Sequence, residues 1–246
     1  MDAKKEHALS FGPAAARYDR FRPPYPRAAV EWAVGAPPPL RVVDLGAGTG
    51  ILTRGLRDAG YTVVPVEPDA GMRSQLAVAT PGLTALAGSA EDIPLPDGSV
   101  DAIVAGQAYH WFDGDAAHAE AARLLRPGSH FAAIWNLRDK REPWVAALDR
   151  IATAAGDLEH PAPRSFGPEF GPVAHREFAH HTTLTAADLV TMMTTRSYYL
   201  TATDDARKRF EAAVRQLADT HPDLAGRESF PLPYRTMVYR ASTLRS

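Results

Sequence analysis

A glycine-rich turn stands at Val42-Val43-Asp44-Leu45-Gly46-Ala47-Gly48-Thr49-Gly50, directly after an apolar segment that begins at Leu40. The pattern predicts a short strand, a sharp turn and then a helix from Ile51 to Ala59. Glycines at three alternate positions let the backbone turn tightly and let a ligand lie against it, because no Cβ intervenes. The first turn of the helix presents free N–H groups, which favour an anionic group such as a carboxylate or a phosphate. The stretch therefore predicts a ligand-binding turn.

Two other interpretations of the turn are weighed against this one. A dinucleotide fingerprint needs G-x-G-x-x-G after the strand, and here the third glycine, Gly50, comes one residue too early. Asp44 would also face a pyrophosphate, where its charge is unfavourable, whereas a carboxylate suits a ligand with a positive group. A nicotinamide-dependent dehydrogenase is therefore not favoured. A tight strand-to-helix turn without any ligand is the second interpretation.

A second carboxylate follows at the end of the next predicted strand. That strand is Thr62-Val63-Val64-Pro65-Val66, and Glu67 comes directly after it. Glu67 lies about 20 residues past Gly46, the spacing at which an acid at a strand end accepts hydrogen bonds from both hydroxyls of a ribose. The chain therefore predicts a ribose contact, a glycine turn and a carboxylate for an amine, without a phosphate site.

These motifs together resemble a known family. Asp44-x-Gly46-x-Gly48-x-Gly50, Val66-Glu67-Pro68 and the segment from Gly88-Ser89-Ala90-Glu91-Asp92 to Asp101 resemble the class I S-adenosylmethionine-dependent methyltransferases. The chain is most similar to the small-molecule branch that includes the ubiquinone-biosynthesis and trans-aconitate methyltransferases. The matching motifs cover about residues 40–136. The resemblance implies S-adenosyl-L-methionine as the cofactor.

The resemblance and the apolar patterning imply an α/β fold with a doubly wound, seven-stranded, mostly parallel sheet of Rossmann-like type. The last strand is expected to be antiparallel and inserted between the fifth and sixth. An N-terminal arm and a C-terminal helical insertion that forms a lid are expected as additions. The strands are expected at 40–45, 62–66, 83–87, 100–105, 129–135, 173–184 and 230–240. The helices are expected at 28–34, 51–59, 69–80, 116–125, 143–155, 185–196 and 203–220.

Length and composition fit one domain of 246 residues, of which 45% are hydrophobic. Within residues 1–246 we expect an N-terminal arm (1–39), a cofactor-binding core (40–136), and substrate-side helices with a final β hairpin (137–246). A net charge of −2 gives no nucleic-acid footprint. No cysteine is present, which excludes disulfides and thiolate metal sites.

Metal, membrane and export signals are not expected either. Neighbouring histidines such as His180 and His181 point to opposite faces of a strand, so we expect no metal site there. The start of the chain lacks the apolar core of a signal peptide, and no apolar run has the length of a membrane span. A cytoplasmic protein, monomeric or homodimeric, is expected.

The resemblance assigns cofactor contacts by position. Tyr18 and Arg22, in an aromatic and basic segment before the first strand, would contact the methionine carboxylate or an acidic substrate. The loop 88–93 would lie beside the adenine, with the Ala90 N–H facing the ring and Ser89 or Glu91 accepting from its amine; many relatives carry Asp at the position of Ser89. The predicted cofactor-binding residues are Tyr18, Arg22, Asp44, Gly46, Ala47, Gly48, Glu67, Pro68, Met72, Ser89, Ala90, Glu91 and Gln107.

The methyl acceptor is expected beside Gly106-Gln107-Ala108-Tyr109-His110-Trp111-Phe112, because ligands of open α/β sheets bind at the carboxyl ends of the strands. His110 is the candidate general base, since imidazole titrates near neutrality; a packing histidine is the alternative. For an acidic substrate, Arg22, Arg196 or Arg235 would be the clamp, with ordinary surface arginines as the alternative. The predicted pocket residues are Tyr109, His110, Trp111, Asn136, Tyr198 and Arg235.

The sequence thus favours methyl transfer to a small organic acceptor at oxygen, carbon or nitrogen, a carboxylate included. Transfer from a sulfonium needs no obligatory catalytic dyad, because positioning the acceptor does most of the work. The same lack of a dyad leaves an alternative open, namely a non-catalytic S-adenosylmethionine-binding or partner-docking protein on the same fold.

Overall fold

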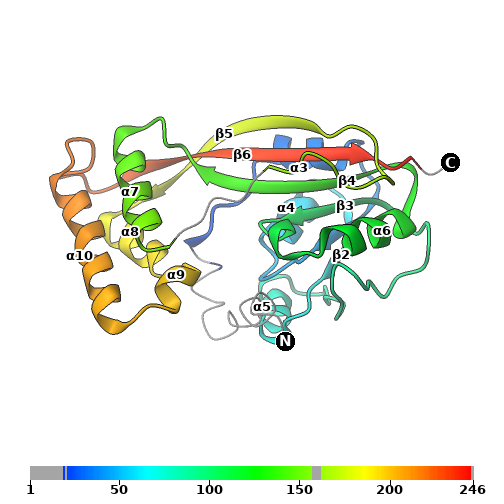
Figure 1. Cartoon of the computed structure of the whole chain (residues 1–246), viewed down its shortest axis with the longest axis horizontal. Helices are drawn as coiled ribbons and strands as arrows, with labels where there is room; N and C mark the ends of the chain where they lie inside the picture. Colours follow the sequence, from blue (N-terminus) through cyan, green and yellow to red (C-terminus); the bar gives the residue numbers. More distant parts are fainter. Residues whose placement is uncertain (1–18, 20, 157–161, 245–246) are drawn as a thin grey trace.

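The computed structural model describes residues 19, 21–156 and 162–244, and it contains one mixed sheet of six strands in the order β2-β1-β3-β4-β6-β5 (Figure 1). The strands β2, β1, β3 and β4 are mutually parallel. β6 is antiparallel to both of its neighbours, as expected for the last strand. The strand bounds are Arg41–Leu45 (β1), Thr62–Val66 (β2), Val100–Gly106 (β3), Leu125–Arg138 (β4), Ala174–Leu184 (β5) and Phe230–Ser242 (β6).

The predicted strand at 83–87 is wrong: only one residue of it, Leu86, makes a parallel bridge to Val66. The Leu86 N–H donates to the Pro65 carbonyl at 2.9 Å, and the Glu67 N–H donates to the Leu86 carbonyl at 3.0 Å. The next bond of a parallel ladder, at Thr84, would need the N–H of Pro65, which proline lacks. The segment therefore lies beside β2 without extending the ladder, and the sheet has six strands rather than seven.

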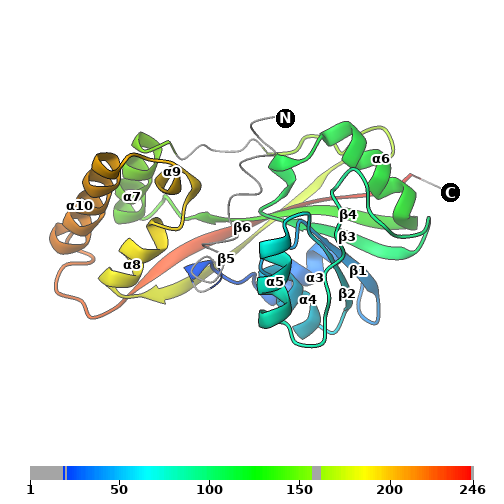
Figure 2. The same ribbon diagram turned by 90° about the horizontal axis from the view of Figure 1, so that it is seen from below.

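Helices cover both faces of the parallel part, as a doubly wound sheet requires (Figure 2). The helices α3 (Arg27–Val34) and α4 (Ile51–Asp58) share a core with Val42, Ala102 and Ala132. Helix α6 (Gly114–Leu124) shares the opposite core with the alternate residues Val43, Ile103 and Ala133. Since successive strand residues point to opposite faces, near-continuous apolar runs are what such a sheet needs. Helix α5 (Ala70–Ala79) follows β2.

A second group of helices gathers around the far ends of β5 and β6 (Figures 1 and 2). It comprises α7 (Pro143–Ala154), α8 (Ala186–Met193), α9 (Ser197–Leu200) and α10 (Asp204–Thr220). These helices form a separate core that includes Trp144, Leu148, Met193 and Phe210. The helix expected at 185–196 ends at Met193, and Thr185 is its N-cap. We call these helices and the hairpin ends they cover the helical lobe.

Across the described ranges, no helix has the length and apolar character that crossing a bilayer would need.

Candidate functional site

The glycine turn joins β1 to α4 and is closed on one side and open on the other. Gly46 has φ +70°, and a methyl group there would lie 2.6 Å from the Cβ of Ala108, so only glycine fits. Gly48 has φ +55°, and a methyl group there would meet nothing within 4 Å. The turn therefore packs on the segment after β3 through Gly46 and leaves open space beside Gly48.

Glu67 faces this turn from the end of β2. One carboxylate oxygen accepts from the Gly48 N–H at 2.9 Å, and the other accepts from the Asp69 N–H at 2.9 Å. Burial raises the pKa of the Glu67 carboxyl, and the two backbone hydrogen bonds act in the opposite direction. The carboxylate is thus held in one orientation beside the open edge of the turn. The expected juxtaposition of these two motifs is present.

Asp44, at the end of β1, is the most deeply buried carboxyl of this region, at 1% exposure. One of its oxygens accepts from the Thr53 hydroxyl of α4, and the other is buried without a hydrogen-bond partner. Burial raises the pKa of Asp44 to about 7; the Thr53 hydrogen bond lowers it, and the charge of Glu67 raises it. A buried carboxyl with an unused acceptor is costly unless a donor or a cation reaches it.

The residues that follow β2 start α5 beside Glu67. Asp69 is the N-cap, because its side chain accepts from the Met72 N–H at 2.7 Å. Arg73 donates to the carbonyls of Glu67 and Pro68 at 2.8 and 2.7 Å. Met72 is buried under this turn. The connection after Glu67 is therefore fixed by hydrogen bonds at each step.

The loop 88–93 closes on itself. Ser89 and Asp92 exchange backbone hydrogen bonds, and the Ser89 hydroxyl accepts from the Glu91 N–H at 3.3 Å. Ala90 is buried, and the Glu91 carboxylate accepts from the Asp113 N–H at 3.0 Å. Glu91 thereby ties this loop to the segment that follows β3.

Strain is concentrated at the carboxyl end of β3. Gln107 has φ +55°, a left-handed conformation that non-glycine residues rarely adopt. Its backbone N–H donates to the Ile134 carbonyl at 2.9 Å, and its side chain donates to the Asn136 carbonyl at 3.1 Å. The strand order reverses between β1 and β3, which is where ligands of open α/β sheets bind. Such strain clusters at functional sites, and it fits that position.

The short 3-10 turn Tyr109–Trp111 separates its three side chains. Tyr109 points into the core on the α6 side, where its ring packs edge-on to Phe166 and its hydroxyl lies 3.0 Å from Nε2 of His118. His110 and Trp111 are half-buried and lie against each other, with ring centroids 4.7 Å apart. Tyr109 therefore packs against the core behind the turn, whereas His110 and Trp111 contact each other.

An N-terminal segment crosses the site, and sequence reasoning missed its main contacts. Asp19 accepts from the Thr49 hydroxyl and from Arg54, each at 2.7 Å, so the segment is tied to the glycine turn and to α4. The sequence signal for this contact is Asp19, an acidic residue within the aromatic and basic run that begins at Tyr18. Tyr18 itself lies outside the described residues.

Asn136, which we predicted as a pocket residue, is engaged by the chain itself. Its amide donates to the carbonyls of Pro23 and Pro24 at 3.1 and 3.2 Å. Its oxygen accepts from the Thr236 hydroxyl at 2.6 Å and lies 3.1 Å from Nε2 of His180. The side-chain amide and oxygen of Asn136 thus have partners within the chain and need no substrate. These contacts hold the N-terminal segment to the end of β4.

Two further predicted pocket residues lie away from the glycine turn. Arg235 forms an ion pair with Glu177 of β5 through both nitrogens of its fork. Tyr198 is buried in the helical lobe, where its ring packs edge-on to Phe210.

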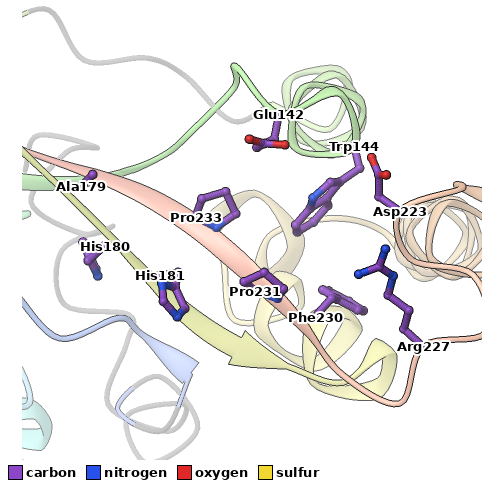
Figure 3. Close-up of a pocket in the computed structure, with 10 residues that line it drawn as sticks. All are labelled: Glu142, Trp144, Ala179, His180, His181, Asp223, Arg227, Phe230, Pro231 and Pro233. Carbon is purple, nitrogen blue, oxygen red and sulfur yellow. The ribbon is translucent and has the colours of Figure 1, made fainter.

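A cavity of about 520 Å³ lies in the helical lobe and not at the glycine turn (Figure 3). Its walls include Trp144, His181, Arg227, Phe230 and Pro231. The close-up shows these side chains on the β5–β6 hairpin, on α7 and after α10. This hollow is therefore separate from the residues that the motifs identify.

Comparison with known proteins gives a consistent result. The family model described as "Methyltransferase domain" matches residues 43–133. An uncharacterized methyltransferase of Mycobacterium tuberculosis is 42% identical over 241 residues, which is 98% of each chain. A malonyl-[acyl-carrier protein] O-methyltransferase of Methylococcus capsulatus is 36% identical over 146 residues, 52% of this chain and 50% of that protein.

A solved structure assigned to a type II methyltransferase from Anaeromyxobacter dehalogenans superposes with a TM-score of 0.66 at 26% identity. The superposition covers 91% of this chain and 97% of the other. The glycine turn, the strand-end acid Glu67 and the strained end of β3 all lie within the matched family region. The chain belongs to the class I S-adenosylmethionine-dependent methyltransferases.

Proposed function

We propose that this enzyme transfers a methyl group to a small organic acceptor, and that the cofactor lies across the carboxyl ends of β2, β1 and β3. The observation that carries the proposal is the hydrogen bond between the Glu67 carboxylate and the Gly48 N–H, beside the open side of Gly48. Carboxylate, exposed backbone and open space are the features that a ribose next to an amino-acid tail would need.

The residues fit the cofactor group by group. In the proposed arrangement, Glu67 binds the ribose hydroxyls and the turn Gly46-Ala47-Gly48 holds the amino-acid tail. The N–H groups at the start of α4 suit its carboxylate. Asp44 supplies the negative charge for its ammonium, which gives the unused buried oxygen a partner. Pro68, Met72 and the loop Ser89-Ala90-Glu91 enclose the adenine, and Gln107 lies at the sulfonium end.

Arg22 and Tyr18 complete the proposal on the N-terminal side. The ion pair between Asp19 and Arg54 fixes the neighbouring segment on the first turns of α4. Arg22 therefore emerges close to that helix start, where the methionine carboxylate or an acidic acceptor would lie.

When bound, S-adenosylmethionine supplies a methyl group already activated by its sulfonium. The chain has to hold the acceptor in line, and positioning of this kind contributes up to roughly 7–11 kcal/mol to a barrier. His110 is proposed as the base for acceptors that carry a proton, and the Trp111 ring as the aromatic face beside the positive sulfur. The helical lobe is proposed to close over the acceptor as a lid and keep water out.

The test is a labelling experiment with the full chain. The enzyme is incubated with S-adenosylmethionine carrying a deuterated methyl group and a small-molecule extract, and products are identified by mass spectrometry. A compound that gains one labelled methyl group, only with active enzyme, is the expected result. Tight binding of S-adenosylhomocysteine without any labelled product would replace the proposal with the non-catalytic alternative, which no feature of residues 21–156 and 162–244 favours.

A further inference from the structure

Three arginines from distant parts of the chain gather around one tyrosine at the edge of the helical lobe. Arg138 is the register partner of Tyr234 across β4 and β6. Arg196 follows α8, and Arg22 belongs to the N-terminal segment. Burial raises the pKa of the Tyr234 hydroxyl, and the charges of Arg196, Arg138 and Arg22 act against that rise. Contacts bring two of these arginines to the end of α8: Arg138 lies 3.9 Å from the sulfur of Met193, and the Arg196 N–H donates to the Met193 carbonyl at 3.5 Å. We call Arg22, Arg138 and Arg196 the arginine cluster.

The cluster is largely shielded from water. The Nε atoms of all three arginines are buried, and the side chain of Arg138 is only 8% exposed. Arg138 pairs with Asp149 at 3.2 Å, and Asp149 also pairs with Lys140 at 3.3 Å. Positive charge held out of water in this way strengthens the attraction for an anion.

The cluster lies next to the proposed acceptor site. Gln107 at the end of β3 donates to the Asn136 carbonyl, and Arg138 follows two residues later on the same strand. Residues i and i+2 of a strand lie on the same face, about 7 Å apart. Arg22 directly precedes Pro23, whose carbonyl accepts from the Asn136 side chain. One residue thus connects the strained end of β3 with two of the three arginines.

The third arginine expected from the sequence as a clamp, Arg235, does not take part. Arg235 is held by Glu177 of β5, and Arg141 lies 3.8 Å from the same carboxylate. Of the clamps expected for an acidic substrate, Arg22 and Arg196 are therefore in the cluster, and Arg138 is added by the structure.

We propose that the methyl acceptor carries a carboxylate that binds between Arg22, Arg138 and Arg196. The inference rests on the proposed function and names the chemical class of its substrate. A planar carboxylate matches the fork of a guanidinium, because the guanidinium donates two parallel hydrogen bonds to the two carboxylate oxygens. Tyr234, whose hydroxyl lies 3.5 Å from the sulfur of Met192, forms the wall behind the acid.

The experiment is a calorimetric titration of the full chain with succinate, citrate and hexanoate, each compared with its uncharged amide, in the presence of saturating S-adenosylhomocysteine. At least one acid is expected to bind at least tenfold more tightly than its amide. Arg196→Gln and Arg22→Gln are expected to weaken the binding of that acid by about tenfold or more. Arg196→Lys should weaken it less, because lysine keeps the positive charge but loses the two-pronged guanidinium.

Arg126→Gln is the matched control, since Arg126 lies at the opposite end of β4 and pairs with Asp101. It removes the same charge and should leave acid binding unchanged. The inference is overturned if acids and amides bind alike, if no acid binds, or if Arg126→Gln has the same effect as Arg196→Gln. S-adenosylhomocysteine is titrated separately into every protein. If S-adenosylhomocysteine fails to bind the wild-type chain, the proposed function itself is rejected. If it binds normally and one of the three overturning results is found, only the proposal of a carboxylate-bearing acceptor is rejected.

Discussion

Asp44 is the residue of the site that links stability to pH. Its folded-state pKa of about 7 lies above the ordinary carboxyl value of 3.8 because of burial. Between pH 3.8 and about 7, the Asp44 carboxyl is therefore protonated in the folded state and ionised in the unfolded state. Stability from this group is fully present below about pH 4 and is lost as the pH rises to about 7.

We predict that Asp44→Asn removes this part of the pH dependence. Between pH 4 and pH 8, the wild type should lose up to about 4 kcal/mol of unfolding free energy from this group, and the variant should not. Denaturant unfolding at both pH values measures the difference. The variant should also bind S-adenosylhomocysteine more weakly, because the ammonium loses a charged partner. Equal pH slopes for the two proteins would contradict the buried state of Asp44.

At the scale of the element, the glycine turn offers a matched pair of substitutions. Gly46→Ala places a methyl group 2.6 Å from the Cβ of Ala108, whereas Gly48→Ala places one in open space. Both residues have positive φ, so each substitution carries left-handed strain of about 1–2 kcal/mol. Overpacking adds about 1–3 kcal/mol only at Gly46.

We therefore predict that Gly46→Ala mainly lowers the stability of the fold and that Gly48→Ala mainly weakens cofactor binding. Gly46→Ala should unfold at clearly lower denaturant concentration than Gly48→Ala. Gly48→Ala should fold and yet lose most of its affinity for S-adenosylhomocysteine, because its methyl group occupies the space meant for the ligand. Unfolding curves and calorimetry on the two variants check this. Unchanged affinity in Gly48→Ala would mean that the open side is not where the cofactor lies.

The contact between the N-terminal segment and β4 depends on one side chain. Asn136→Ala removes the partners of Pro23, Pro24, Thr236 and His180 together. Leaving buried polar groups unpaired should cost about 2–4 kcal/mol of unfolding free energy. Thr236→Val removes one of these bonds and should cost about 1 kcal/mol. Thermal unfolding of both variants measures the two losses of unfolding free energy. Equal losses would show that Asn136 does not hold these partners together.

At the scale of the whole molecule, local patterns predicted the parallel half of the sheet and its helices well. The bounds of β2 match, and β1, α4 and β3 begin or end within one residue of expectation. The turn and Glu67 were predictable because each follows directly from a strand end. The absence of a ladder at 83–87 is a local effect as well, because Pro65 lacks the N–H that the next hydrogen bond would need.

Long-range contacts explain what the sequence could not show. Asn136 meets Pro23 across 113 positions and Thr236 across 100 positions, and no spacing rule reaches that far. The placement of Arg138 beside Tyr234 likewise depends on the register of β4 with β6. The strained backbone of Gln107 also follows from tertiary contacts, since glutamine has no preference for positive φ.

The most direct measurement is calorimetric titration of S-adenosylhomocysteine into the wild type, Glu67→Ala and the control Glu31→Ala, whose residue lies exposed on α3. The wild type and Glu31→Ala should bind alike, and Glu67→Ala should remain folded but bind at least tenfold more weakly, since hydrogen bonds to a charged group contribute about 1.5–3 kcal/mol. Equal affinity in wild type and Glu67→Ala would contradict a cofactor held between the end of β2 and the glycine turn.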